Sequence, residues 1–165
     1  MPVSITDALD IIYKNVKVVS TETLPIENTL GYTLQEDKIA SFDLPRFDNS
    51  AMDGYAVKCN GATQTVKVNN TIIYAGDNPT MTLQDNEAIK IMTGAVLPKG
   101  TQAVVPIENV THKNDSVELP LNVALNANLR YAGEDVKKGE CYLHKGSKIT
   151  AYSIACRTHI THFTS

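Results

Sequence analysis

The sequence lacks an apolar run approaching the roughly 20 residues that a membrane-spanning helix needs. Residues 1–4 also lack the charged start of a signal peptide. The three cysteines, Cys59, Cys141 and Cys156, are odd in number and far apart, which is untypical of a disulfide framework or a CxxC metal site. We therefore expect a cytoplasmic protein with ordinary reduced thiols and no membrane partner.

Positive charge is also scarce. The formal net charge is −3 and the sequence pI is near 5.8. Lys and Arg are scattered along the chain and form no basic stripe, so we expect no nucleic-acid partner. The closest pair of histidines, His159 and His162, has no carboxylate near it in the sequence. The histidines are therefore interpreted as surface or packing residues.

Several catalytic motifs are missing. No GxGxxG or GxxxxGK stretch is present, which argues against a dinucleotide fold and a P-loop. Ser50 and Thr93 lack the context of a nucleophile elbow and an obvious His base, so a hydrolase triad is not supported. The stretch "DNSAMDG" looks like a calcium loop, but Met52 stands where an EF-hand needs an oxygen ligand.

The composition is sufficient for a folded protein. Hydrophobic residues make up 42% of the 165 residues, enough for the core of one domain or two small lobes. A helix is predicted over residues 4–14, where Ser4 can act as the N-cap with Asp7 three residues later. Its apolar face consists of Ile5, Ala8, Leu9 and Ile12. A last helix is predicted to begin after Thr150 as its cap.

The region between the helices is rich in strand-forming residues. From residue 55 to about residue 129, short segments of Val, Ile and Thr alternate with turn residues, a pattern typical of a small antiparallel barrel or coiled sheet. Residues 130–140 form a polar crossing, and residues 141–150 are predicted as another strand and turn. The predicted fold class is mixed α+β, mainly β.

Three polar, glycine-containing stretches border these strand-like runs: "NSAMDGYAV", "IMTGAVLPKG" and "RYAGEDVKKG". They offer carboxylate, hydroxyl and backbone N–H groups, which together suit a site for an oxyanion and a hard cation. The alternative is that they are three hairpin turns, which are common in β proteins. The residue types alone leave both interpretations open.

The order and spacing of these stretches closely resemble a known family. The motifs "DLPRFDNSAMDGYAV", "IKIMTGAVLPKGTQAVVPIE" and "NLRYAGEDVKKGE" resemble the N-terminal region of MoeA-type molybdopterin molybdenumtransferases, which include the E domain of gephyrin. The resemblance extends from about residue 4 to residue 155. It implies a role in molybdenum cofactor biosynthesis: members insert molybdenum from molybdate into adenylylated molybdopterin, with Mg²⁺ as cofactor, and release AMP.

The resemblance also implies an architecture and partners. Residues 1–25, 36–52 and 136–165 are expected to form an elongated helix-containing domain, with residues 26–35 and 53–135 inserted as a β-rich, barrel-like lobe. Members form homodimers, and a molybdopterin adenylyltransferase is a further expected partner beside the small-molecule substrates. In the family a pterin-binding domain follows this region. The sequence stops before it, so we expect the 165-residue chain alone to be incomplete as an enzyme.

Site residues follow from the same motifs. The resemblance implies catalytic roles for Asp53, Thr93 and Asp135, and substrate binding by Arg130 and Ser50. Asp53 and Asp135 are the expected Mg²⁺ ligands, because Mg²⁺ is usually bound through one or two carboxylates and substrate phosphates. The Thr hydroxyl and the planar Arg fork suit phosphate or molybdate oxygens. Asp135 could instead orient Arg130.

Other polar residues of the motifs receive weaker assignments. Asp48 and Asn49 are expected to shape the loop, as Ser50 is in the alternative to substrate binding, while Glu108 and Glu134 are secondary site candidates. Tyr32 and Gln102 depart from the residues usual in the family, but neither belongs to the expected site. Two alternative functions stay open: a non-catalytic dimeric scaffold of the gephyrin type, and a small oxyanion-binding β module.

Overall fold

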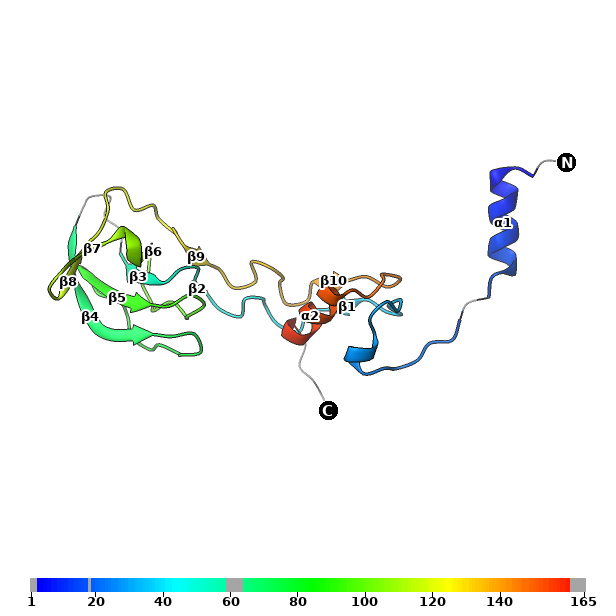
Figure 1. Cartoon of the computed structure of the whole chain (residues 1–165), viewed down its shortest axis with the longest axis horizontal. Coiled ribbons are helices and arrows are strands. Elements are labelled where there is room, and N and C mark those ends of the chain that lie inside the picture. The colour runs from blue at the N-terminus through cyan, green and yellow to red at the C-terminus, as the bar shows by residue number, and fades with distance from the viewer. Residues whose placement is uncertain (1–2, 18, 59–63, 161–165) are drawn as a thin grey trace.

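The computed structural model describes residues 3–17, 19–58 and 64–160, with only the backbone described for residues 157–160. The chain is elongated (Figure 1): a β-rich lobe lies at one end, helix α2 lies near the middle, and helix α1 lies at the other end beside the N-terminus. Two residues discussed above, Cys59 and His162, lie outside the described residues.

The described residues form α-helices, short 3-10 helices and mostly short strands. Within this part of the chain, no helix is both long and apolar enough to cross a bilayer. The elements in chain order are α1 (Ile5–Asn15), η1 (Ile26–Asn28), β1 (Lys38–Ile39), β2 (Asn49–Ser50), β3 (Gly54–Val57), β4 (Thr65–Ile73), β5 (Glu87–Ile91), β6 (Ala103–Pro106), η2 (Ile107–Asn109), β7 (Thr111–Lys113), β8 (Ser116–Glu118), β9 (Leu129–Arg130), β10 (Cys141–Leu143) and α2 (Ala151–Ile160).

Both predicted helices are confirmed together with their caps. At the start of α1, the Ser4 hydroxyl oxygen accepts a hydrogen bond from the backbone N–H of Asp7 at 3.1 Å. At the start of α2, the Thr150 hydroxyl oxygen accepts from the N–H of Ser153 at 3.2 Å. In each case a side-chain oxygen satisfies a backbone donor that has no partner within the helix.

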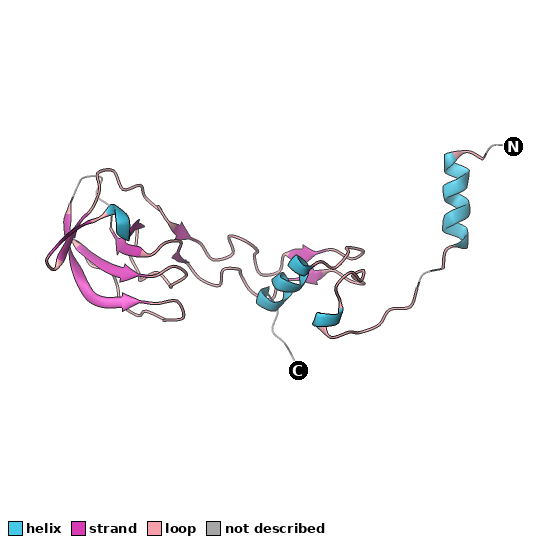
Figure 2. Ribbon diagram, viewed as in Figure 1, coloured by secondary structure: helices cyan, strands magenta, loops and turns pink. Residues whose placement is uncertain are grey.

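A six-stranded sheet in the order β6-β3-β5-β4-β8-β7 forms the β-rich lobe, residues 54–118 (Figure 2). Its strands pair antiparallel with one exception, since β4 and β5 are parallel. The prediction of an antiparallel sheet is therefore wrong at this pair. Residues 74–86 form the long return connection that a parallel pair requires, and no local pattern distinguishes such a connection from a wide hairpin.

The hydrophobic core lies on both faces of this sheet. Alternate residues of β3 point to opposite faces, so Tyr55 and Val57 contribute to one buried cluster and Ala56 to the other. Strand β5 divides in the same way, with Ala88 in the first cluster and Ile89 in the second. The centre of the sheet is therefore held by apolar contacts on both sides.

The strand-like pattern predicted up to residue 129 ends earlier in the structure. Strand β8 stops at Glu118, and the chain then turns repeatedly until β9 begins at Leu129. Three asparagines, Asn122, Asn126 and Asn128, adopt positive φ angles of 59°, 65° and 57°. Asn tolerates this left-handed conformation better than most residues. These turns place β9 beside β2.

Two short ladders lie between the lobe and α1, in the part of the chain here called the elongated segment (residues 26–50 and 129–160). Strand β1 pairs with β10, and β2 pairs with β9. The N–H groups of Gly31 and Leu34 donate to the carbonyls of Ile149 and Ser147, each at 2.9 Å. We expected residues 26–35 in the β-rich lobe, but these bonds pair them with residues 147–149. The other domain boundaries stay predictions.

Gly54 permits a close approach of strands at the centre of the lobe. It is the first residue of β3 and pairs with Ile91 of β5 on one side and Pro106 of β6 on the other. A Cβ atom at residue 54 would lie 2.2 Å from the carbonyl oxygen of Val105. Because this neighbour is backbone, it cannot move aside as a flexible side chain would.

We predict that Gly54→Ala lowers the free energy of unfolding by about 1–3 kcal/mol, the usual cost of overpacking a well-packed site. Gly76→Ala is the matched control: its φ is +98°, but a Cβ there meets nothing within 4 Å. The control should therefore show only the smaller cost of the left-handed backbone. Urea unfolding compares the two, and equal midpoints for wild type and Gly54→Ala would contradict the clash.

Candidate functional site

The three polar stretches meet around the loop of residues 48–54. The N–H of Ser50 donates to the carbonyl of Ala95 at 3.0 Å, and the N–H of Gly94 donates back to Ser50 at 2.8 Å. The β2–β9 ladder places Asn49 opposite Arg130. Backbone pairing alone therefore brings together motifs that are far apart in the sequence.

Asp53 and Thr93 are direct partners. Asp53 Oδ1 accepts hydrogen bonds from the backbone N–H of Thr93 at 2.7 Å and from its hydroxyl at 2.8 Å. These bonds, the backbone one first, hold the pKa of Asp53 below its usual value. The carboxylate is exposed, so it is a fixed, ionised group that a ligand can reach.

Arg130, Glu134 and Asp135 form a second group, the Arg130 cluster. Arg130 Nη2 lies 2.6 Å from Asp135 Oδ1, and Nε lies 3.5 Å from Glu134 Oε1. The hydrogen bond and charge of Asp135, with a smaller contribution from Glu134, raise the pKa of Arg130. The Arg130 side chain stays 38% exposed. The guanidinium is thus oriented by two carboxylates and still accessible to an anion.

Ser50 does not present its hydroxyl to a ligand. It is 1% exposed. Its hydroxyl donates to the carbonyl of Met52 at 2.6 Å and accepts from the N–H of Met52 at 3.3 Å. The substrate-binding role expected for Ser50 is not supported by this geometry, which instead makes Ser50 a residue that shapes the loop.

Asp48, Asn49 and Glu108 lie around the same loop. Asp48 Oδ1 accepts from the N–H of Ala132 at 2.9 Å, and the Asn49 amide donates to Phe47 O at 3.0 Å. Both side chains thus bond backbone, as residues that shape a loop do. Glu108 is exposed in η2.

Sequence reasoning proposed Asp53 and Thr93 separately and missed their direct contact. The two residues are 40 positions apart, and no local pattern links them. It also gave no site role to Cys141 and His144, which lie beside Asp37 in the structure. Such contacts depend on strand register, which the sequence pattern does not specify.

Comparison with known proteins identifies the family. Residues 3–159 match the family described as MoeA N-terminal region (domain I and II). The chain belongs to this family. The resemblance drawn from the sequence motifs is therefore confirmed over nearly the whole chain.

Relatives named molybdopterin molybdenumtransferase share this similarity. The Staphylococcus epidermidis protein is 32% identical over 160 residues, and the alignment covers 93% of this chain and 38% of the relative. The Haemophilus influenzae protein is 38% identical over 139 residues, covering 81% and 34%. The chain therefore spans well under half the length of these MoeA-family relatives.

A solved structure has the same fold. The crystal structure of the molybdopterin biosynthesis MoeA protein from Pyrococcus horikoshii superposes with a TM-score of 0.86 at 31% identity, covering 94% of this chain and 43% of that chain. This agreement confirms the predicted fold class, a mainly β structure with a barrel-like lobe.

The Asp53–Thr93 contact predicts a measurable titration. The pKa of Asp53 should lie below the ordinary 3.8 and should rise toward it in Thr93→Val, which keeps the backbone bond but removes the hydroxyl. Because folding lowers the pKa of Asp53, the contact contributes its full stabilisation at pH values above the pKa of the unfolded chain. This contribution is lost as the pH falls through the pKa of the folded protein. NMR titration of the carboxyl carbon measures this shift.

Thr111→Val is the matched control for this titration, because Thr111 is exposed in β7 and is not a partner of Asp53. It should leave the pKa of Asp53 unchanged. An Asp53 pKa at the ordinary value in the wild-type protein would refute the interpretation.

Proposed function

We propose that this chain is the N-terminal part of a molybdopterin molybdenumtransferase that acts in molybdenum cofactor biosynthesis. In this reaction molybdenum from molybdate enters adenylylated molybdopterin and AMP is released. The observation that carries the proposal is the family match over residues 3–159, together with the meeting of all three motifs at the loop of residues 48–54. The names of the relatives give the reaction class.

The charge of the site supports a role for a divalent cation. Three carboxylates, Asp53, Glu134 and Asp135, accompany the single guanidinium of Arg130 in the two groups described above. Molybdate and phosphate are themselves anions, and like charges at short range repel. We therefore infer that the anionic substrates bind together with Mg²⁺.

Asp53 fits a Mg²⁺ site better than Asp135. A carboxylate offers about four lone-pair positions for hydrogen bonds or metal ions. The two hydrogen bonds from Thr93 to Asp53 Oδ1 leave the other positions of Asp53 open to a metal ion. Asp135 is paired with Arg130 at 2.6 Å, which suits the orientation of the guanidinium rather than a metal ligand. Bound at Asp53, Mg²⁺ would offset the negative charge of substrate phosphate and molybdate oxygens.

The remaining roles follow from hydrogen-bond direction. Arg130 is the oxyanion-binding group of the proposal, because its fork suits phosphate-like oxygens and two carboxylates fix its orientation. The Thr93 hydroxyl donates to Asp53, so its proposed role is to position that carboxylate. A cytoplasmic location and a molybdopterin adenylyltransferase partner, which would supply the substrate, complete the proposal.

We further infer that a second copy of the chain covers helix α1. None of the residues of α1 is buried. Its apolar face leaves Ile5, Leu9 and Ile12 exposed by 83%, 45% and 52%. Apolar side chains gathered on one helix face indicate an interaction surface. A symmetric dimer would bury this face.

We predict that Asp53→Asn lowers molybdenum insertion by about 100-fold or more, because it removes a charge from the site while nearly preserving its shape. The assay uses a chimera in which residues 3–159, the stretch that matches the family, replace the corresponding N-terminal region of the Haemophilus influenzae relative. The 165-residue chain alone should be inactive, since it covers 34% of that relative. Thr111→Val is the control.

Two outcomes would contradict this proposal. Full molybdenum-insertion activity of the Asp53→Asn chimera would refute the proposed role of Asp53 as a metal ligand. Turnover by the isolated chain would show that it needs no further domain. Melting temperatures of the variants separate loss of chemistry from loss of folding.

We also predict that Leu9→Lys shifts the chain from dimer to monomer, because it places a charge in the buried interface. Asp10→Lys, an exposed neighbour on the same helix, introduces the same side chain as a control and should leave the dimer intact. Sedimentation velocity over a range of concentrations reports the state. A wild-type chain that stays monomeric at high concentration would refute the proposed dimer.

A further inference from the structure

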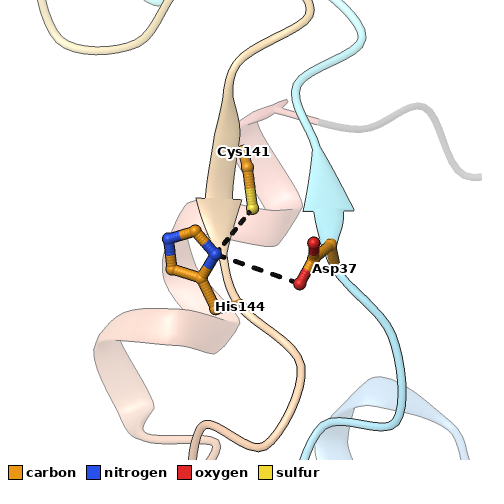
Figure 3. A group of neighbouring side chains, drawn as sticks. All are labelled: Asp37, Cys141 and His144. Atoms are coloured by element: carbon orange, nitrogen blue, oxygen red, sulfur yellow. Dashed lines mark hydrogen bonds and ion pairs between the residues drawn. The ribbon is translucent and has the colours of Figure 1, made fainter.

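A cluster of three metal-ligating side chains lies in the elongated segment, on the β1–β10 ladder (Figure 3). Asp37 precedes β1, Cys141 begins β10, and His144 follows β10. The register pairs Lys38 with Leu143, which sets Asp37 opposite His144. The three side chains point toward one another in Figure 3.

The distances in this cluster are close to those of a metal site. His144 Nδ1 lies 3.3 Å from Cys141 Sγ and 3.9 Å from Asp37 Oδ1, and all three ligand atoms lie within 4.8 Å of one another. Zinc bonds of about 2.3 Å to sulfur and about 2.0–2.2 Å to nitrogen or oxygen, at tetrahedral angles, place ligand atoms about 3.3–3.6 Å apart. A bound ion would have to draw the ligand atoms, which lie up to 4.8 Å apart, closer together by side-chain rotation.

We propose that Asp37, Cys141 and His144 form a binding site for a borderline-soft divalent cation of the Zn²⁺ type. A thiolate, an imidazole and a carboxylate are the ligands that such ions take in proteins. Mg²⁺ prefers oxygen ligands alone, so this site differs in chemistry from the proposed one at Asp53. It also lies on a different ladder from the β2–β9 pair that bears Arg130.

Local hydrogen bonds hold part of this cluster in place. Asp37 Oδ1 accepts from the N–H of Lys145 at 2.7 Å, which fixes the carboxylate beside His144 and leaves lone pairs for a metal. The Cys141 thiol donates to Leu143 O at 3.4 Å. Metal binding replaces that donation, because the thiol proton leaves to solvent as the thiolate bonds the ion.

The cluster is open to solvent. The side chains of His144 and Asp37 are 76% and 56% exposed, so an ion can enter and a water can take the fourth position. Residue 37 and residues 141–144 belong to segments that are distant in the sequence. The bound ion therefore clamps β1 to β10 and stabilises the folded elongated segment.

The decisive measurement uses the untagged 165-residue chain with Zn²⁺ and with Co²⁺ as a spectroscopic probe. We expect one Zn²⁺ per chain by competition with a chromophoric chelator, and a near-ultraviolet thiolate-to-Co²⁺ band. Cys141→Ser should abolish the band, and Cys141→Ser, Asp37→Asn and His144→Ala should each weaken Zn²⁺ binding by about tenfold or more. Zn²⁺ should raise the melting temperature of wild type by more than that of Cys141→Ser.

The controls are Cys156→Ser and His162→Ala, which replace a cysteine and a histidine outside the proposed site and should retain both the band and the affinity. Excess Mg²⁺ should not displace Zn²⁺. A wild-type chain without the thiolate band overturns the proposal, and this outcome requires no variant to fold. Unchanged Zn²⁺ affinity in Cys141→Ser overturns it as well.

Discussion

The close approach of strands at Gly54 is the constraint on which the site depends. Because residue 54 has no side chain, β3 lies directly between β5 and β6, with the Val105 carbonyl where a Cβ would be. Asp53 immediately precedes this point. Its carbonyl accepts from Ile107 at 3.1 Å and its carboxylate accepts from Thr93. The position of the Asp53 carboxylate is therefore set by its contacts with residues that follow β5 and β6.

The candidate site residues include a fixed carboxylate, that of Asp53, and an oriented guanidinium, that of Arg130. Thr93 favours the ionised form of Asp53, and Asp135 and Glu134 favour the charged form of Arg130. Each group is thus held in one protonation state and one orientation while it remains exposed. Such preorganisation lowers the reorganisation needed when a charged ligand arrives. Carboxylates outnumber guanidinium groups among these residues, and this excess of negative charge is the reason for the Mg²⁺ in the proposed function.

Local features of the fold could be predicted from the sequence, and non-local ones could not. The caps at Ser4 and Thr150 depend on residues three positions apart, so their patterns are visible in the sequence. The parallel β4–β5 pair depends on the path of a connection, which composition does not determine. The motif residues were identified by family resemblance, whereas the burial of Ser50 follows from tertiary pairing to the turn at Gly94.

Stability is unevenly distributed between the two ends of the molecule. The β-rich lobe contains both buried apolar clusters, whereas none of the residues of α1 is buried. An isolated helix shorter than about 12–15 residues is marginal in water, and α1 spans 11 residues. The Ser4 cap alone is a small stabilisation. We therefore expect that α1 is stably helical only when a partner packs against its apolar face. The buried apolar contacts that hold the strands beside Asp53 and Thr93 therefore lie in the lobe, whereas α1 presents an apolar face that a partner can cover.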